Sequence, residues 1–145
     1  MDIKIKLLND KMLPPKQATE YAAGVDLQAN LEEKVCIHPG ERKLILTGIA
    51  LSIPVGLVGF ICPRSGLALK HGISITNAPG VIDPEYVGEI GVILENRGDE
   101  DFWVNPGDRI AQLVFSMVCT PRWKIVKELD KTQRGSKGFG STGVK

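Results

Sequence analysis

Apolar and polar residues alternate with a period of two along much of this chain. In residues 3–7, 43–46 and 90–95, isoleucine, leucine or valine occupies at least every second position. Successive side chains of a β-strand point to opposite faces, so each of these segments predicts a strand with one apolar face. Residues 110–118 are almost continuously apolar, which predicts a strand that is covered on both sides.

Turn signals separate these segments at short intervals. They occur at residues 39–40, 54–56, 79–80, 97–99 and 106–107, and each of them contains glycine. Many short strands between glycine and proline turns are typical of a β-sandwich, a jelly roll or a barrel. We therefore predict an all-β, jelly-roll-like fold.

Helical patterns are scarce in comparison. Ser65 to Lys70 predicts a turn or two of helix, and Gln17 to Ala23 is a weaker helix candidate. A chain of 145 residues with no internal repeat predicts one domain with a substantial core. We place this β-rich domain at residues 1–129 and a flexible, glycine-rich C-terminal tail at residues 130–145.

Composition narrows the range of partners. The net charge is +1, so no overall field attracts polyanions, and nucleic acid is not an expected partner. The longest apolar run, residues 49–62, is short and interrupted by Pro54, Gly56 and Gly59, which disfavours a membrane span. The N-terminus is strand-like and does not resemble a signal peptide. We expect an intracellular protein that binds no membrane.

Cysteine and histidine are few and scattered. Cys36, Cys62 and Cys119 are odd in number, widely spaced and form no CxxC pair. This usage argues against a disulfide framework or a zinc site and suits a reducing compartment such as the cytoplasm. His38 and His71 are the two histidines, and the sequence predicts no metal site built on histidine or cysteine.

A turn bounded by glycines carries the first candidate chemistry. Asp83 and Tyr86 lie between Gly80 and Gly88, just before an apolar strand. A carboxylate on a rigid turn can deprotonate water, and an aromatic ring packed against a sugar would leave no room for a 2′-hydroxyl. Asn77 has the donor and acceptor that suit a pyrimidine edge, or it simply caps the turn. The plainer alternative is a hairpin with polar residues at its tip.

Two further segments carry groups that suit phosphate. In AGVDLQA, Asp26 stands between apolar neighbours and is either a solvated strand acid or an acid that orients a metal-bound water, because Mg²⁺ commonly keeps waters. In PRSGLA, Arg64 supplies a forked cation, Ser65 a hydroxyl and Gly66 close backbone approach. A helix that starts here would aim N–H groups at an anion, whereas the alternative is a strand end and a turn.

The segment GDRIAQLVF contains one polar residue that needs a partner. Gln112 interrupts an apolar run, so it bonds either within the core or to a ligand. Asp108 and Arg109 are expected to form a structural ion pair. No Walker-type GxxxxGK[ST] sequence occurs, and no GxGxxG follows a strand and opens a helix, so the standard mononucleotide and dinucleotide folds are disfavoured.

The C-terminal segment differs from the rest of the chain. Residues 130–145 are rich in glycine and bury too little apolar surface to fold in isolation. They form either a disordered tail or a lid. Arg134 and Phe139 favour the lid, because one phosphate-binding group and one stacking ring suit closure over a nucleotide.

The segments AGVDL, PRSGLA, GVIDPEYVG, GDRIAQL and RG…GFGSTG, in this order and spacing, resemble the five motifs of the trimeric dUTPase family, the deoxyuridine triphosphate nucleotidohydrolases. The resemblance covers nearly the whole chain, and the motifs are jointly very specific. The chain departs from the family pattern at Lys137, where most relatives have glycine. This departure bears on how the tail closes and could add a phosphate contact.

The resemblance implies a jelly-roll-like subunit that assembles as a homotrimer. The reaction would be hydrolysis of dUTP to dUMP and pyrophosphate with Mg²⁺, which limits uracil incorporation into DNA and supplies dUMP for thymidylate synthesis. Each active site would lie between subunits. One subunit would supply the uracil pocket, a second the phosphate contacts, and the third its C-terminal tail.

The resemblance also implies residue roles. Asp83 would be the general base for the water that attacks the α-phosphorus. The other positions form the substrate and metal sites: Asn77 with Gly80, Val81 and Ile82 for uracil, Tyr86 against ribose, Arg64, Ser65 and Gly66 for phosphate, Asp26 and Gln112 for metal-bound water and phosphates, Arg134 for phosphates, and Phe139 with Gly140 over the base.

Two other functions fit the same general fold. A dCTP deaminase needs an acid beside the amino-bearing carbon of the base, but the hairpin carries the dUTPase pattern and no deaminase motif is seen. A non-catalytic nucleotide-sensing protein would retain the pocket and lose the base or the tail. Asp83 and the tail motif are both intact in this chain, which favours the enzyme.

Overall fold

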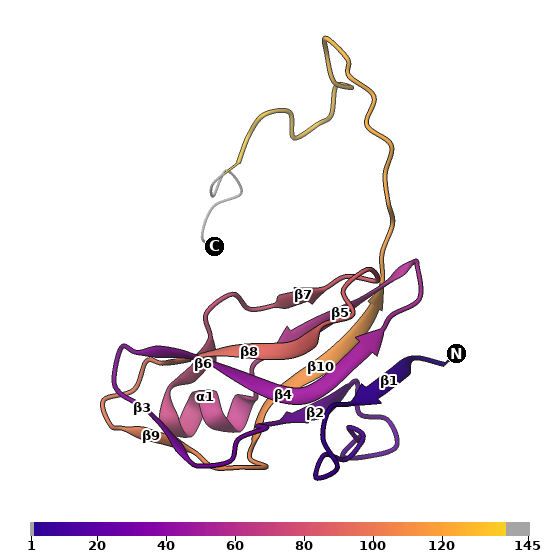
Figure 1. Cartoon of the computed structure of the whole chain (residues 1–145). Helices are drawn as coiled ribbons and strands as arrows, with labels where there is room; N and C mark the ends of the chain where they lie inside the picture. Colours follow the sequence, from indigo (N-terminus) through magenta and orange to yellow (C-terminus); the bar gives the residue numbers. More distant parts are fainter. Residues whose placement is uncertain (1, 139–145) are drawn as a thin grey trace.

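The structure is a computed structural model that describes residues 2–138. Across these residues, ten strands and one helix form two four-stranded sheets and a two-stranded ribbon (Figure 1). The predicted all-β fold is confirmed. The two sheets are separate, so the chain forms a sandwich rather than a closed barrel.

The first sheet has the strand order β1-β4-β8-β6, and all neighbours are antiparallel. Its strands are β1 (Lys4–Leu7), β4 (Arg42–Ser52), β8 (Glu89–Asn96) and β6 (Ile73–Ile75). The alternation predicted for β8 is confirmed, since Ile90, Val92 and Leu94 are buried and the residues between them are partly exposed. This sheet therefore turns one apolar face towards the core.

The second sheet has the strand order β2-β10-β5-β7, again antiparallel throughout. Its strands are β2 (Gly24–Gln28), β10 (Arg109–Met117), β5 (Leu57–Cys62) and β7 (Gly80–Ile82). The ribbon pairs β3 (Val35–Ile37) with β9 (Phe102–Val104). The helix α1 (Ser65–His71) follows β5, where the sequence predicts it. In residues 2–138 no helix is long and apolar enough to cross a membrane.

Apolar side chains from the two sheets meet in one core. Its most buried members come from both sheets and include Leu27, Leu113, Ile45, Ile90 and Leu94, each at most 2% exposed. Full burial of such a side chain contributes about 1.5–3 kcal/mol. The packing of sheet on sheet thus fixes the strands whose ends carry the candidate site.

A bulge in β4 depends on a glycine. Gly48 has a φ of 68°, a left-handed conformation that disfavours other residues. A Cβ at this position would lie 2.6 Å from Cγ of Met12. The neighbouring Thr47 is fully buried, and its hydroxyl donates to the Ile90 carbonyl oxygen at 2.7 Å. The bulge is therefore packed and its polar group is satisfied.

One helix prediction is wrong. Gln17 to Ala23 is not helical, because Gln17 forms an isolated β-bridge with Val25. The Gln17 side chain donates to the Ala22 carbonyl oxygen at 2.8 Å. This contact across the segment closes a loop, and the periodicity of the sequence cannot predict such a contact.

The last strand is covered over only half of its length. Ile110, Ala111 and Leu113 are buried, whereas Ser116 and Met117 are exposed. The prediction that residues 110–118 form a strand buried on both faces is therefore wrong for its last residues, where the chain leaves the sandwich. Residues 118–138 then extend away from the sheets without strand or helix (Figure 1).

Candidate active site

Asp26 and Gln112 lie side by side on neighbouring strands. Gln112 of β10 is paired with Asp26 of β2 on one side and with Cys62 of β5 on the other. Directly paired residues of antiparallel strands project to the same face. Gln112 Nε2 also donates to the Pro63 carbonyl oxygen at 2.9 Å. This bond ties β10 to the segment that carries Arg64.

Two arginines hold Asp26 between them. Arg64 Nε lies 3.0 Å from Asp26 Oδ1, and Arg109 Nη1 lies 3.1 Å from Asp26 Oδ2. Arg64 Nη1 also donates to the Arg109 carbonyl oxygen at 2.9 Å. Two guanidinium groups and one carboxylate leave one net positive charge. This arginine–aspartate cluster (Asp26, Arg64 and Arg109) is partly exposed and suits an anionic ligand.

The cluster corrects the expected ion pair between Asp108 and Arg109. Arg109 pairs with Asp26, while Asp108 Oδ2 accepts hydrogen bonds from the Asn105 backbone N at 2.8 Å and from Asn105 Nδ2 at 3.0 Å. Asp108 therefore closes a turn, and Arg109 joins the candidate site. The sequence missed Arg109 because it meets Asp26 only through the pairing of β2 with β10.

Ser65 and Gly66 begin α1 beside this cluster. Arg64 is the N-cap residue, and its side chain reaches Asp26 instead of capping the helix. A Cβ placed on Gly66 would meet no described heavy atom within 4 Å. The first turn of α1 is thus accessible beside the two arginines, as the predicted phosphate segment requires.

Asp83 lies at the start of the turn after β7. Its carbonyl oxygen accepts a hydrogen bond from the Tyr86 backbone N at 3.1 Å, with Pro84 at the second position of the turn. Aspartate at the first and proline at the second position favour such a turn. Asp83 is exposed, so its carboxylate is accessible to water or to a bound molecule.

Tyr86 is fixed by two contacts at the end of the same turn. Its hydroxyl donates to the Glu89 carbonyl oxygen at 2.7 Å. A Cβ on Gly88 would lie 2.9 Å from the Tyr86 hydroxyl oxygen and 3.0 Å from Cζ. The absence of a side chain at Gly88 therefore makes room for the ring, which is 45% exposed and can form a pocket wall.

The strand β7 offers backbone groups rather than side chains. Gly80 and Ile82 are buried, and Val81 is 56% exposed. Within residues 2–138, β7 is an edge strand, so its outer N–H and C=O groups have no strand partner there. Asn77 Nδ2 lies 3.5 Å from the Cβ position of Gly80. The side-chain amide and the strand edge thus lie together, as recognition of a base edge needs.

The arginine–aspartate cluster follows the end of β5, and the hairpin group (Asn77, β7, Asp83 and Tyr86) lies along β5 with Asp83 at the end of β7 that points away from the cluster. Ile82, next to Asp83, is paired with Gly59, and Arg64 lies five residues farther along the chain. The strand part of this path, from Gly59 to Cys62, is about 10 Å long at about 3.3 Å per residue. Asp83 is therefore separated from Arg64 by the length of β7, although both lie along the same strand β5.

The tail residues lie apart from both groups. Arg134 lies in a turn of the segment after β10, where its Nε donates to the Lys137 carbonyl oxygen at 2.9 Å. The guanidinium is exposed and meets neither the cluster nor the hairpin group in this chain. Phe139 and Gly140 lie outside the described residues.

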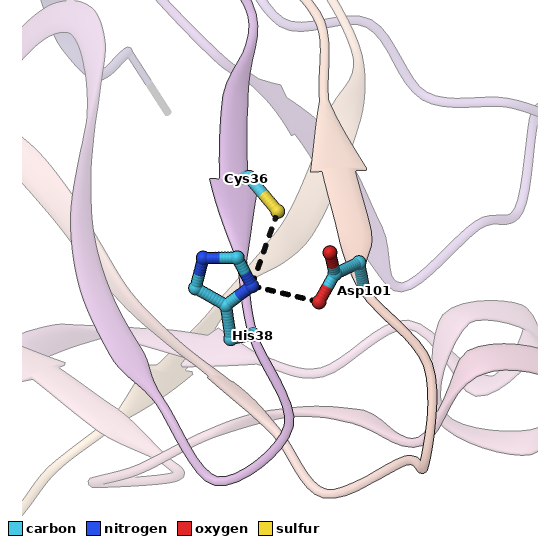
Figure 2. A group of neighbouring side chains, drawn as sticks. All are labelled: Cys36, His38 and Asp101. Atoms are coloured by element: carbon cyan, nitrogen blue, oxygen red, sulfur yellow. Dashed lines mark hydrogen bonds and ion pairs between the residues drawn. The ribbon is translucent and has the colours of Figure 1, made fainter.

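One constellation was not expected from the sequence. Cys36, His38 and Asp101 lie together on the ribbon of β3 and β9 (Figure 2), although no site built on histidine or cysteine was predicted. Cys36 lies in β3 and His38 directly follows this strand, so the two residues are two positions apart and lie on one face. The sequence could have indicated the proximity of Cys36 and His38 from this spacing. The position of Asp101 depends on the register between β3 and β9, which the sequence does not show.

A β-sandwich with a cationic cluster beside a strand end and an acid–aromatic hairpin on an edge strand has the groups that suit a ligand with both phosphate and a base. The dUTPase family model matches residues 10–143. The chain therefore belongs to the dUTPase family.

Close relatives agree with this membership. The chain is 52% identical over 141 residues to the deoxyuridine 5′-triphosphate nucleotidohydrolase of Syntrophotalea carbinolica, which covers 97% of this chain and 96% of the relative. It matches the dUTPase of Staphylococcus bacteriophage 80alpha with dUPNHPP at a TM-score of 0.90 and 31% identity, over 99% of both chains.

A third relative concerns a metal. A variant dUTPase from phage phi11 of S. aureus matches with a TM-score of 0.81 and 28% identity, over 88% of this chain and 98% of that one. That structure concerns the coordination of a structural Mg(II) ion.

Proposed function

We propose that this protein hydrolyses dUTP to dUMP and pyrophosphate, by attack on the α-phosphorus of a water molecule that Asp83 deprotonates. Membership of the dUTPase family supports the reaction. The observation that carries the assignment is the placement of an accessible Asp83 directly after the edge strand β7 and beside Tyr86. Such a reaction limits uracil incorporation into DNA and supplies dUMP for thymidylate synthesis.

The hairpin group would bind the nucleoside part of the substrate. The outer backbone groups of Gly80, Val81 and Ile82 and the amide of Asn77 supply donors and acceptors for the uracil edge. The ring of Tyr86 would pack against the deoxyribose and leave no room for a 2′-hydroxyl. Asp83 follows directly in the chain, so a base held at β7 brings the α-phosphate close to this carboxylate.

The arginine–aspartate cluster would bind the phosphates. Arg64 has more N–H donors than the two that bond to Asp26 and Arg109, and Ser65, Gly66 and Gln112 lie beside it. Phosphoryl transfer mainly needs positioned water and neutralised charge. The guanidinium groups supply positive charge, and Asp83 accepts the proton, an assistance worth about 10²–10⁴-fold in rate.

Asp26 fits a supporting role towards a divalent metal. Its carboxylate is a hard oxygen donor, 22% exposed, with each oxygen engaged by an arginine. Magnesium commonly keeps several waters and takes ligands from substrate phosphates. Asp26 would therefore hold a metal-bound water of Mg²⁺ carried by the triphosphate, and that ion would reduce the charge of the phosphate groups.

A homotrimer with shared sites explains the separation along β5. The hairpin group of one copy would face the arginine–aspartate cluster of a second, so that both contact one dUTP. Apolar exposure supports assembly: Trp123, Ile125 and Leu129 are 90%, 98% and 87% exposed in the segment that leaves the sandwich. Contiguous exposed apolar groups of this kind mark interaction surfaces.

The tail would complete the site from a third copy. We assign residues 1–129 to the β-rich domain and residues 130–145 to a segment that closes over bound nucleotide. Arg134 would contact the phosphates, and Phe139 with Gly140 would cover the base. Closure excludes water from the reacting groups. Lys137 lies within reach of Arg134 and would add a positive charge there.

The rival functions are not favoured. The family match and the solved relative with a dUTP analogue concern dUTPases. Asp83, which a sensor would not need, stands in place on an accessible turn.

Product analysis tests the proposal. The full chain with Mg²⁺ is expected to release pyrophosphate from dUTP and no ammonia from dCTP. Asp83→Asn should lower kcat on dUTP by about 10²–10⁴-fold and still bind the nucleotide, because the change keeps the size of the side chain. Glu85→Gln, in the same exposed turn, is the matched control and should keep normal turnover. Near-normal hydrolysis by the Asp83 variant would contradict the assignment of the base.

A further inference from the structure

Cys36, His38 and Asp101 converge on one ring nitrogen. His38 Nδ1 lies 3.7 Å from Cys36 Sγ and 2.7 Å from Asp101 Oδ1 (Figure 2). The cysteine is half-buried, and the other two side chains are 64% and 49% exposed. None of the three belongs to the arginine–aspartate cluster or the hairpin group.

The arrangement is unlike a catalytic triad. In a triad the two ring nitrogens divide the work, with one facing the nucleophile and the other facing the acid. Here the same Nδ1 faces both the thiol and the carboxylate. A nitrogen, a sulfur and an oxygen that surround one point are instead the donor set of a metal site.

We propose that Cys36, His38 and Asp101 form a binding site for Zn²⁺ or a similar transition-metal ion, with water as the fourth ligand. Tetrahedral Zn²⁺ with a Zn–S bond of about 2.3 Å and a Zn–N bond of about 2.0 Å places sulfur and nitrogen about 3.5 Å apart. The thiol already lies 3.7 Å from Nδ1. The half-exposed Asp101 carboxylate must retreat by about 0.6 Å to reach the corresponding N–O separation.

The backbone around the cluster is rigid. Asn96 is fully buried, and its Nδ2 donates to the Ile37 carbonyl oxygen and to the Glu100 carbonyl oxygen, both at 2.8 Å. Ile37 lies between Cys36 and His38, and Glu100 directly precedes Asp101. One buried amide thus holds both backbone segments that carry ligands, and such support is what a preformed metal site needs.

A second set of contacts fixes the β3 side. The His38 backbone N–H donates to Glu41 Oε2 at 2.9 Å, and this bond is the main reason why the pKa of the Glu41 carboxyl is lowered. Lys43 Nζ donates to the Cys36 carbonyl oxygen at 2.7 Å and lies 3.2 Å from Glu41 Oε1. The metal-binding side chains are therefore the adjustable parts of an otherwise fixed turn.

Binding would exchange a proton for the metal. Burial and the nearby Asp101 carboxylate raise the pKa of the Cys36 thiol, so the free thiol carries its proton. On binding, the S–H bond breaks, a sulfur–metal bond forms and that proton passes to solvent. The Nδ1–H that faces Asp101 Oδ1 also loses its proton, to solvent or in exchange for a proton at Nε2, and the Nδ1 lone pair then binds the metal. The ion would link β3 to the residue that precedes β9 and stabilise the ribbon.

Cobalt provides a direct probe of thiolate ligation. The metal-free full chain, in excess Mg²⁺ to occupy oxygen-rich sites, is titrated with Co²⁺ and followed by the near-ultraviolet thiolate-to-cobalt absorption. We expect saturation at about one ion per chain and loss of the band on addition of Zn²⁺, which exceeds Co²⁺ in affinity for such ligands. The apparent melting temperature should rise with Zn²⁺.

Matched variants decide the location. Cys36→Ser should abolish the band, and Asp101→Asn should weaken Co²⁺ binding at least tenfold. Cys119→Ser and Asp99→Asn, which change an exposed cysteine and a neighbouring acid, should bind like the parent. Hydrolysis of dUTP with Mg²⁺ should be unchanged in all four, which separates this site from the proposed active site.

Three outcomes would overturn the proposal. They are no thiolate band in the parent at saturating Co²⁺, a band that survives in Cys36→Ser, and a band that disappears equally in Cys119→Ser. Circular dichroism checks that each variant is folded. If Cys36→Ser does not fold, Asp101→Asn tests the location of the site instead. An unchanged Co²⁺ affinity in Asp101→Asn would contradict ligation by the carboxylate.

Discussion

Tyr86 keeps its position because residue 88 has no side chain. The hydroxyl of Tyr86 donates to the Glu89 carbonyl oxygen across Gly88, and a methyl group on Gly88 would lie 2.9 Å from that hydroxyl. The tyrosine ring is the movable partner in this contact. Gly88 therefore controls where the proposed sugar-packing ring stands, without touching the substrate.

Gly88→Ala should weaken the preference of the enzyme for deoxyribose. The added methyl group displaces the ring and breaks a hydrogen bond worth about 0.5–1.5 kcal/mol, so the ratio of kcat/KM for dUTP over UTP should fall by up to about tenfold. Steady-state kinetics with the two nucleotides measures this ratio.

Tyr86→Phe serves as the companion variant. It removes the hydroxyl and keeps the ring, so its effect on the dUTP to UTP ratio should be smaller than that of Gly88→Ala. An unchanged ratio in Gly88→Ala would show that ring position does not decide sugar selection.

The turn between β8 and β9 is organised by the buried side chain of Asn96. Besides its two bonds to the Ile37 and Glu100 carbonyl oxygens, its Oδ1 accepts from the Gly98 backbone N at 2.9 Å. One residue at the end of β8 thus joins β3 to the approach to β9. A buried polar group with all of its bonds made rigidifies the elements around it.

Asn96→Ala should destabilise the fold severely. It leaves two carbonyl oxygens and one N–H without their partner, and such groups cost about 1–3 kcal/mol each when buried. We expect a loss of about 3–5 kcal/mol in the free energy of unfolding. Urea unfolding at one fixed protein concentration measures it, because the stability of an oligomer depends on concentration.

The control for this variant is another asparagine in a turn. Asn105 is exposed, and its side chain bonds only to Asp108 within the described contacts, so Asn105→Ala should cost no more than about 1 kcal/mol. Equal losses in the two variants would show that Asn96 has no special role.

Sequence patterns predicted those elements that depend on local order. The alternation in β8, the helix after Arg64 and the turn after Asp83 follow from neighbouring residues, and the structure has all three. The segment at Gln17 failed because its partner, Val25, lies outside the local window. The bulge at Gly48 is likewise set by packing across strands rather than by local sequence.

The candidate site was predictable to the same extent. Asp26, Arg64, Asp83 and Tyr86 were found from segments that carry their own turns and strands. The pairing of Arg109 with Asp26 was not, because strand register brings together residues 83 positions apart. The same reason hid the meeting of His38 with Asp101, which are 63 positions apart. Strand register is a property of the folded sheet and cannot be predicted from a single sequence.

For the whole molecule, the separation of Asp83 from Arg64 along β5 is the decisive feature. The arginine–aspartate cluster and the hairpin group each have part of what dUTP hydrolysis needs, and Asp83 follows the end of β7 that lies away from Arg64. A cyclic assembly brings different surfaces of neighbouring copies together. The active site that we propose, made from two chains, would let Asp83 of one copy and Arg64 of another reach one substrate.

Two inactive variants should then complement each other. Chains with Asp83→Asn lack the base, and chains with Arg64→Ala lack a phosphate ligand. In a mixed trimer, the intact hairpin group of an Arg64→Ala chain can face the intact Arg64 of an Asp83→Asn chain. That pairing restores a complete site. With random mixing of equal amounts, a site has a chance of one half of receiving an intact Asp83 and a chance of one half of receiving an intact Arg64. About a quarter of the sites should therefore be complete.

A matched mixture shows whether the recovery depends on geometry. Asp83→Asn and Asn77→Ala both damage the hairpin group, and every hairpin in that mixture carries one of the two changes. Its activity should stay at the level of the separate variants. Both mixtures are prepared by unfolding and refolding the variants together, with each variant treated alone as the baseline.

The decisive measurement is the rate of pyrophosphate release from dUTP by the refolded mixture of Asp83→Asn and Arg64→Ala chains. Recovery to about a quarter of the parent rate, with none in the Asp83→Asn and Asn77→Ala mixture, is the predicted result. A mixture that remains as inactive as its two components would contradict an active site in which Asp83 of one copy works with Arg64 of another.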